Sequence, residues 1–342
     1  MANSTDSPAI FPLSVRVTAF VIYATLSSIG IAIYFYVLYV MRLKKELFKA
    51  SFFRVVYHLA ANDITFLFVY LLLAAPLSLT ARPVYGELVC AVTAHLDTIL
   101  YKCGGALLLP MSLNRYFAFL EALRIKTNPV LLKFFTKTAG LNIALACCWS
   151  YGLFWFVINT YISCIKVFLP AGMHFTYLCV DYGAFWFQAD VRTSALVPFL
   201  NLSVYLFLYI RIRLARKTHN QVVAVNDMAK RKAEKDRKKR EKQDRMLVYQ
   251  ALVVASVQVL SVFTFWGTMS LNWRIAGPII VTCGTIINCA VNPVVYVLFN
   301  RNLRGFVKAA LANKSLVAPE DTTKNKTSNI LNKLAAKPAA QS

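Results

Sequence analysis

The chain has 342 residues, of which 58% are hydrophobic and only 15% are charged, and its formal net charge is +23. Soluble globular chains are about 45–50% apolar and about 25% charged. The composition therefore excludes a soluble enzyme, a disulfide-rich secreted module and a nucleic-acid-binding domain, and it predicts an integral membrane protein.

Seven apolar segments follow one another along the chain, and each is long enough to cross a bilayer, which takes about 20 apolar residues. Five of them contain no charged residue. The second contains His58 and Asp63, and the third contains His95, Asp97 and Lys102. We therefore predict an all-α fold, a seven-transmembrane helix bundle. The segments lie at 17–41, 55–81, 88–114, 138–165, 193–210, 246–273 and 275–300.

Positive charge is concentrated on one side of this seven-helix scheme. The connections and the tail on that side contain 32 of the 38 Lys and Arg residues, and 14 of these lie in residues 211–245. An excess of Lys and Arg in short loops marks the cytoplasmic face. We therefore predict a plasma-membrane protein with an extracellular N-terminus and a cytoplasmic C-terminus. The basic run at 230–240 is expected to lie near anionic lipid rather than on nucleic acid.

The segments outside the spans divide the chain into two tails and a membrane domain. Residues 1–15 are expected to be an extracellular tail that is glycosylated at Asn3, because Asn3-Ser4-Thr5 is a glycosylation sequon. Residues 16–311 form the membrane domain, and residues 312–342 form a polar cytoplasmic tail that is expected to be disordered. Apolar residues at helical spacing predict an amphipathic helix on the inner membrane surface: Leu303, Phe306, Val307, Ala310 and Leu311.

Polar side chains inside the predicted spans are candidates for function, because a charge at mid-span costs about 2.5–3.5 kcal/mol. Asp63 is such a charge and must face the interior of the bundle. Asn288 and Asn292, one helical turn apart in the last span, are its expected partners. Pro293 weakens the last helix and provides a hinge. These residues predict an intramembrane polar cluster beside a hinge, where a packed bundle can hold two arrangements.

Each predicted helix from the second to the seventh contains one short motif, and together these motifs point to a known protein family. In this order and spacing, the chain resembles the rhodopsin-like (class A) G-protein-coupled receptors. The separation of 25 residues between Cys90 and Arg115 is that of the family. The matching residues are Asp63, Cys90, Arg115 with Tyr116, Trp149, Pro198, Trp266, Asn292 with Pro293 and Tyr296, and Phe306 in the surface helix.

Several family positions carry other residues. The first span has no asparagine near Gly30, and Gly104 replaces a small hydroxyl residue that helps to bind sodium in the family. Asn114 replaces the aspartate before Arg115, and Val248 stands where an acidic partner of that arginine is often found. These departures argue against a bound sodium ion and against an ionic lock. Such loosened motifs look like the nematode serpentine chemoreceptors of the gamma or V class.

The resemblance implies a receptor that binds an extracellular ligand, a chemosensory small molecule, and activates a heterotrimeric G protein when the helix bundle opens. A receptor for a peptide or a biogenic amine transmitter is the alternative, and a seven-helix transporter is a more distant one. Catalytic residues, a cofactor, a metal site and a nucleic-acid partner are not expected.

The resemblance also implies the residues that contact the ligand. Asp97 lies 18 residues before Arg115, where amine receptors hold the counter-ion of their ligand. Lys102 is expected to neutralise Asp97 in part, and a structural or general polar role for this pair is favoured over an amine site. The other implied ligand contacts are Trp186, Trp266 and Met269.

At the cytoplasmic end, the resemblance implies that opening of the sixth helix exposes Arg115 and a cavity for a helix of the G protein. Because Asn114 and Val248 cannot form the charged bonds of the family, we expect ligand-independent signalling unless another group restrains Arg115. The other implied switch residues are Tyr116, Asn292, Pro293 and Tyr296.

A disulfide bond is also implied on the extracellular side. The resemblance pairs Cys90, at the outer end of the third span, with Cys179 in the second outer loop. A bond between Cys164 and Cys179 within that loop is the alternative.

Overall fold

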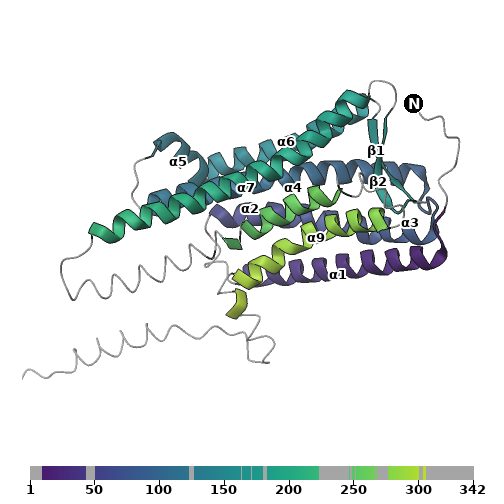
Figure 1. The fold of residues 1–342 in the computed structure, drawn as a ribbon, viewed down its shortest axis with the longest axis horizontal. Coiled ribbons are helices and arrows are strands. Elements are labelled where there is room, and N and C mark those ends of the chain that lie inside the picture. The colour runs from purple at the N-terminus through teal and green to yellow at the C-terminus, as the bar shows by residue number, and fades with distance from the viewer. Residues whose placement is uncertain are drawn as a thin grey trace, which may run out of the picture.

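The computed structural model of the chain describes residues 10–43, 51–122, 127–162, 164–170, 172–179, 183–222, 246, 249–250, 252–265, 267, 276–299 and 303–305. Its long helices run roughly along one direction and form a bundle (Figure 1). The helix α4 (Gly86–Ala122) packs against several other helices of the bundle, and α1 (Leu13–Leu43) packs against the last long helix, α9 (Ala276–Phe299).

A helix occupies each of the seven predicted spans, so the prediction of a seven-helix bundle is confirmed. The second span is continuous through α2 (Ser51–Val69), the π-helix η2 (Tyr70–Ala74) and α3 (Ala75–Thr80). In the sixth span, residues 252–265 are the longest described helical stretch. The remaining spans are α6 (Thr138–Tyr161) and α7 (Gly183–Val222), together with α1, α4 and α9.

Five of the described helices are long and apolar enough to cross a membrane by themselves. Their outward faces carry large apolar side chains, among them Leu72, Phe154 and Leu206, which are 60%, 53% and 49% exposed. A water-soluble surface rarely shows so many exposed apolar groups. Lipid covers such a surface without cost, and helices leave no backbone polar group unsatisfied in lipid. The helix α4 is not among the five, because Asp97 and Lys102 lower its mean hydropathy.

The π-helix in the second span has a local cause. Pro76 has no amide hydrogen, and its ring would collide with the carbonyl four residues earlier in a regular α-helix. The wider turn at Tyr70–Ala74 makes room, and the amide of Ala75 donates to the carbonyl of Tyr70. This turn also sets the direction of the Tyr70 side chain, which contacts α4 (see below).

A β-hairpin in the second outer loop is a departure from the predicted all-α fold. The strands β1 (Cys164–Leu169) and β2 (His174–Cys179) pair antiparallel, with Cys164 opposite Cys179. Both strands are rich in β-branched and aromatic residues, which favour strands. The turn that joins them contains Met173, whose φ of 57° is left-handed. The hairpin lies at one end of the bundle (Figure 1).

A short helix at the opposite end of the bundle, α5 (Pro129–Thr136), was also not predicted. Asn128 caps it by accepting hydrogen bonds from the amides of Val130 and Leu131, at 2.9 and 3.4 Å. Pro129 then starts the helix, where its missing amide hydrogen costs nothing. An asparagine followed by proline is thus a local helix-start signal.

Most of the predicted surface helix lies outside the described residues. Leu303–Gly305 is a helical turn, and Leu303 is buried against Val40, Val56 and Tyr296. The two predicted tails, apart from residues 10–15, also lie outside the described residues.

Candidate functional site

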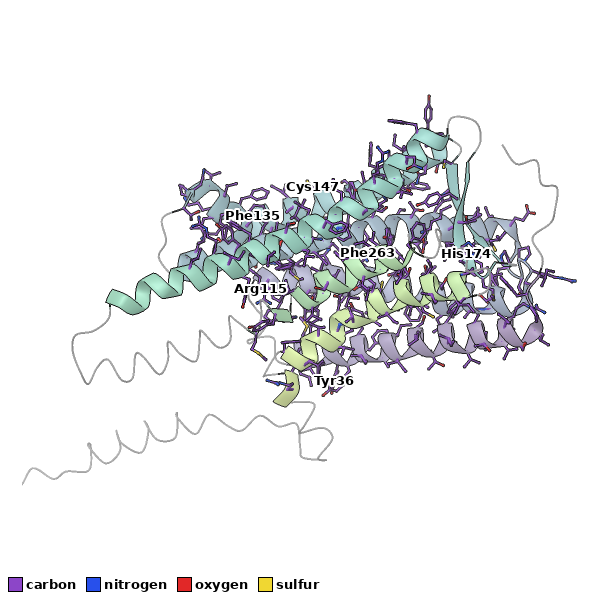
Figure 2. The ribbon with its side chains drawn as sticks, in the orientation of Figure 1. Tyr36, Arg115, Phe135, Cys147, His174 and Phe263 are labelled. Atoms are coloured by element: carbon purple, nitrogen blue, oxygen red, sulfur yellow. The ribbon has the colours of Figure 1, made fainter. Side chains whose placement is uncertain are left out.

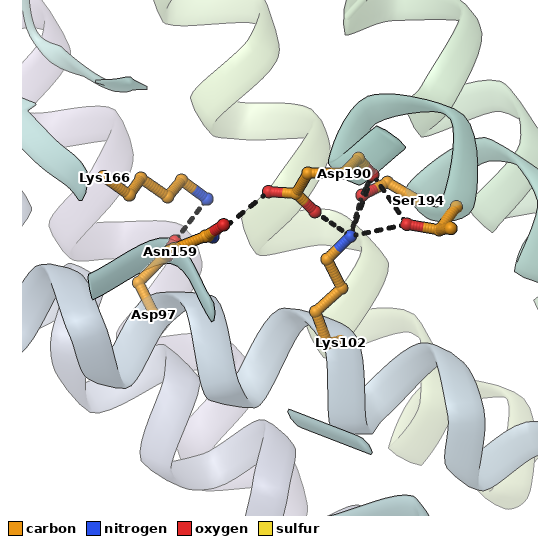
Figure 3. A network of polar contacts seen from close by, with 7 residues as sticks. Asp97, Lys102, Asn159, Lys166, Asp190 and Ser194 are labelled. Carbon is orange, nitrogen blue, oxygen red and sulfur yellow. Dashed lines mark hydrogen bonds and ion pairs between the residues drawn. The ribbon is translucent and has the colours of Figure 1, made fainter. Parts of the chain in front are cut away.

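Two buried ion pairs lie near the hairpin end of the bundle (Figure 3). The first joins Asp97 of α4 to Lys166 of β1, with 2.5 Å between Oδ2 and Nζ. The second joins Lys102 of α4 to Asp190 of α7. The side chain of Asp97 is 0% exposed, and those of Lys102 and Asp190 are 2% and 1% exposed. We call these four residues the outer charge cluster.

The Lys102 ammonium is fully engaged by α7 and α6. It donates to the Asp190 carbonyl at 2.9 Å, to Ser194 at 2.6 Å and to Thr193 at 3.2 Å. It also lies 4.4 Å from the centre of the Trp155 ring, a favourable cation–π distance. Lys102 therefore binds α4 to the two neighbouring helices.

The expected neutralisation of Asp97 by Lys102 is wrong, and helix geometry explains why. Five residues along an α-helix correspond to a rotation of about 140°, so the two side chains leave α4 in different directions. Asp97 faces Lys166 and also accepts a hydrogen bond from the hydroxyl of Tyr70 at 3.2 Å. Asp190 accepts a further bond from Asn159 of α6 at 3.4 Å.

The sequence analysis missed the partners of Asp97 and Lys102 in this network, among them Tyr70, Lys166 and Asp190. The sequence did contain an indication of these charged partners, because a charge buried in lipid needs an opposite charge. Outside the basic side of the scheme the chain has few charges, and Lys166 and Asp190 are two of them. Of the other implied ligand contacts, Trp266 and Met269 lie outside the described residues, and so does the side chain of Trp186.

The predicted intramembrane polar cluster centres on Asp63, which is 3% exposed. The structure brings Asn292 to it, with 2.7 Å between Nδ2 and Oδ2, and Asn62 donates to the other oxygen at 3.1 Å. Tyr34 of α1 also donates its hydroxyl hydrogen to Asp63. Tyr34 lies one turn after Gly30, so this tyrosine supplies the first-helix contact for which no asparagine is present.

A cavity of about 40 Å³ lies between the outer charge cluster and Asp63. Its wall includes Lys102, Ser194, Gln258, Asn288 and Asp63. One water needs about 10–15 Å³ on this measure, so the cavity has room for a few waters. Sites for drug-sized ligands are about 300–1,000 Å³, so a ligand of that size needs the helices or the hairpin to move.

Gly104 lies on the same wall, and its lack of a side chain matters there. A Cβ atom at this position would come within 2.7 Å of Nδ2 of Asn62. Asn62 thus takes the space in which the family places a small hydroxyl group. Asn288, an expected partner of Asp63, lines the cavity, and its Oδ1 accepts no hydrogen bond from the described residues.

Replacing Tyr34 with phenylalanine is expected to destabilise the protein by about 1.5–3 kcal/mol, because a hydrogen bond to a charged, buried group is lost. Tyr36→Phe is the matched control, since the Tyr36 hydroxyl has no hydrogen-bond partner among the described residues. Thermal unfolding of the purified variants measures both effects. Equal unfolding temperatures for the two variants would contradict the assigned role of Tyr34.

Arg115, a predicted switch residue, lies toward the other end of α4 (Figure 2). The Arg115 guanidinium carbon is 3.4 Å from the centre of the Phe52 ring at the start of α2. Tyr116 packs toward α7, with its ring centre 6.1 Å from that of Phe207. Tyr296 donates to the Met111 sulfur at 3.6 Å, which joins α9 to α4. Pro293 is buried within α9.

Asn114 is turned toward the second inner connection. Its Nδ2 donates to the carbonyl of Phe135 in α5 at 2.5 Å. The residue that replaces the family's aspartate therefore ties α4 to α5. Val248, the other departure at this end, lies outside the described residues.

The disulfide pattern differs from the favoured prediction. Cys90 is a free thiol, whereas Cys164 is disulfide-bonded. The bond expected between Cys90 and Cys179 is therefore not present. The hairpin register places the backbone of Cys164 opposite that of Cys179, which is the arrangement that the alternative pairing requires.

Replacing Cys164 with serine is expected to lower surface expression, because loss of a native disulfide costs about 2–5 kcal/mol. Cys90→Ser is expected to leave expression near the native amount, since this thiol makes no disulfide. Surface staining of tagged variants measures both. A strong loss with Cys90→Ser and none with Cys164→Ser would reverse the assignment.

Comparisons with known proteins identify the family and the fold of the chain. Residues 25–300 match the family described as serpentine type 7TM GPCR chemoreceptor Srx. Among solved structures, squid rhodopsin matches with a TM-score of 0.63 and 14% sequence identity, over 97% of this chain and 94% of that chain. No curated protein sequence matches the chain.

The structural match shows the rhodopsin-like fold, and the family match confirms the expected resemblance to serpentine chemoreceptors. The matching class is Srx, which replaces the expected gamma or V class. These families are receptors and not enzymes. The chain belongs to the Srx family of serpentine seven-transmembrane chemoreceptors.

Proposed function

We propose that this protein is a receptor that binds an extracellular chemosensory small molecule and activates a heterotrimeric G protein. The family match over residues 25–300 is the observation that carries the proposal. The helix α4 has the groups that this function needs: Asp97 and Lys102 lie in its first half, and Arg115 lies near its last turns.

The ligand-facing end is proposed to be the outer charge cluster with the cavity below it. Asp97 and Lys102 are the described residues that we assign to ligand recognition, and Trp186, Trp266 and Met269 remain proposed contacts. The hairpin packs over this region, because its turn residue Met173 is 0% exposed and its carbonyl accepts a bond from Tyr23 at 3.1 Å.

The G-protein-facing end is proposed to be the region around Arg115 and Tyr116. Opening of the sixth helix would move it away from α4 and α7 and leave an apolar groove. A helix of the G protein fits such a groove through apolar anchors. Asn292, Pro293 and Tyr296 would transmit the change through α9, because Asn292 contacts Asp63 and Tyr296 contacts Met111 of α4.

The orientation follows from the charge asymmetry. Residues 1–15 are proposed to be extracellular and glycosylated at Asn3, residues 16–311 to be the seven-span receptor domain, and residues 312–342 to be a cytoplasmic tail. Of the Lys and Arg residues, 32 of 38 then face the cytoplasm, as the positive-inside rule requires. The plasma membrane is the proposed location.

An epitope tag before Ser4 is expected to stain intact cells, and a tag after Ser342 is expected to stain only permeabilised cells. The physical reason is that the basic loops stay on the cytoplasmic side. Immunofluorescence with and without detergent measures this. Staining of the C-terminal tag on intact cells would contradict the orientation.

The function itself is tested in reporter cells that express the receptor with a panel of G proteins. Volatile and water-soluble cues are screened against the native chain and against Arg115→Ala at equal surface expression. The expected result is a cue that signals through the native chain and fails with the variant. Uptake of a cue without any G-protein signal would instead support a transporter.

A further inference from the structure

Two polar side chains lie on the outward face of α2, close to the start of this helix. Arg54 and His58 are both exposed, and a spacing of four residues places them on the same face. The helix rises about 6 Å over four residues, so the imidazole lies one turn deeper in the membrane than the guanidinium. Thr65, farther along this face, is also exposed, but its hydroxyl donates to the carbonyl of Ala61 at 2.8 Å. That hydroxyl needs nothing from the lipid.

The neighbouring helix α6 orients both side chains. Nη1 of Arg54 donates to Oδ1 of Asn142 at 3.2 Å, and the indole N–H of Trp149 donates to Nδ1 of His58 at 3.2 Å. An indole nitrogen can only donate, so Nδ1 accepts and the imidazole hydrogen is on Nε2. In the part of the chain that the structure describes, Nε2 has no hydrogen-bond partner. His58 therefore offers an N–H donor to the outside of the bundle.

A lipid molecule contains acceptors at the two depths where these donors lie. The polar region of each leaflet is about 5–8 Å thick, since a bilayer of about 40–45 Å has a hydrocarbon core of about 30 Å. The phosphate lies in this region, and the glycerol ester carbonyls lie at its boundary with the hydrocarbon. One helical turn spans about the same depth. A phosphate beside Arg54 thus places an ester carbonyl at the level of His58.

The charges at this end of the bundle favour an anionic phospholipid. Lys137, directly before α6, is exposed, and the basic connections on this side contain most of the Lys and Arg residues of the chain. Such a surface attracts anionic lipids. A guanidinium binds a phosphate through charge-assisted hydrogen bonds. A sterol has a single hydroxyl and no charge, so it satisfies one of the two donor groups and leaves the other.

We infer that Arg54 and His58, held in place by Asn142 and Trp149, form a binding site for one anionic diacyl phospholipid. Its phosphate contacts the Arg54 guanidinium, and one of its ester carbonyls accepts a hydrogen bond from Nε2 of His58. An acyl chain then follows the exposed face of α2 past Ala61. The inference goes beyond the proposed function, because it involves neither the extracellular ligand nor the G protein.

A pair of lipids that differ only in the ester carbonyls tests the site. Full-length protein in a non-ionic detergent is titrated with dioleoylphosphatidylglycerol and with its diether analogue, which keeps the phosphate and the chains. Native mass spectrometry measures the affinity for the first lipid bound. The ester lipid is expected to bind about 2–10 times more tightly, which is the factor that one neutral hydrogen bond provides.

Variants assign the two contacts to their residues. His58→Phe is expected to bind both lipids with the affinity of the diether lipid, because the donor to the carbonyl is gone. Arg54→Gln is expected to weaken both lipids about tenfold or more and to leave their ratio unchanged, because the phosphate is common to both. Thr65→Val and Arg42→Gln are the matched controls, since Thr65 bonds within its helix and Arg42 is exposed at the end of α1. Both controls are expected to keep the native affinities.

Equal affinity of the native protein for the two lipids would overturn the inference, and this comparison needs no variant to fold. It would also be overturned by an ester preference that survives His58→Phe, or by an equal loss with Arg42→Gln and Arg54→Gln. Cholesterol that displaces dioleoylphosphatidylglycerol and is insensitive to Arg54→Gln would show a sterol site instead. Because no cue and no G protein take part, this result and the proposed receptor function can each fail without the other.

Discussion

Replacing Asp190 with asparagine is expected to destabilise the receptor by about 3–5 kcal/mol, because the buried Lys102 ammonium then loses its counter-charge. Both side chains are at most 2% exposed, so water does not compensate the loss. Thermal unfolding of the purified protein in one detergent measures the effect. Glu87→Gln is the matched control, because Glu87 is an exposed carboxylate at the start of α4 and its loss is expected to cost less than 1 kcal/mol.

A double-mutant cycle separates the interaction energy between Lys102 and Asp190 from the contribution that each side chain makes alone. Lys102→Met alone is also expected to be strongly destabilising, since Asp190 is left buried and charged. The double variant with Lys102→Met and Asp190→Asn is expected to be more stable than the sum of the two losses, because no unpaired charge remains. Strictly additive losses would show that the two residues do not stabilise each other.

Replacing Phe52 with leucine is expected to raise ligand-independent signalling about tenfold. The Arg115 guanidinium lies 3.4 Å from the centre of the Phe52 ring, both side chains are half-buried, and a cation–π contact is worth about 0.5–2 kcal/mol depending on its shielding from water. An equilibrium moves tenfold for about 1.4 kcal/mol, so the loss suffices to populate the open bundle. We therefore propose that Phe52 restrains Arg115, a role for which the sequence analysis named no residue.

Basal G-protein activation in cells, at equal surface expression, measures this effect. Phe154→Leu is the matched control, because Phe154 is 53% exposed on α6 and its ring packs against Trp155. If the basal signals of Phe52→Leu and of the native protein are equal, the contact between Phe52 and Arg115 does not restrain the switch.

The helices of the bundle were predictable from the sequence because a bilayer imposes a length and a composition on a helix that crosses it. The Asp63 environment was predictable in part, since a buried charge needs polar partners and one of the two expected partners, Asn292, contacts it. Tyr34 was not foreseen, because a tyrosine in an apolar helix also occurs as an ordinary packing residue. Its contact with Asp63 depends on how α1 is rotated against α2, which no local pattern encodes.

The hairpin and the outer ion pairs were not predictable for a related reason. Lys166 and Asp190 lie 69 and 93 residues after Asp97, and only tertiary packing brings them to α4. The family likeness pointed to a Cys90 bond, whereas the structure attaches the hairpin through Lys166 and through the Met173 carbonyl. The likeness in motifs thus indicated where the loop after α6 meets the bundle, but it did not predict which residues make the contacts.

A single helix connects the two proposed sites. Asp97 and Arg115 are 18 residues apart on α4, a rise of about 27 Å along the helix axis. Between them, Lys102 and Gly104 line the cavity, and Met111 contacts Tyr296. We therefore propose that a shift of α4 at the hairpin end changes the contacts of Arg115 without an intermediate element.

The most direct test of the account is guanine-nucleotide exchange by purified heterotrimeric G proteins, with the receptor reconstituted in lipid nanodiscs. We expect the native receptor to accelerate exchange on at least one heterotrimer, Phe52→Leu to accelerate it further, and Arg115→Ala to abolish the effect. If neither the native receptor nor Phe52→Leu accelerates exchange on any heterotrimer tested, with and without active cues, the proposal that the bundle signals through a G protein is contradicted.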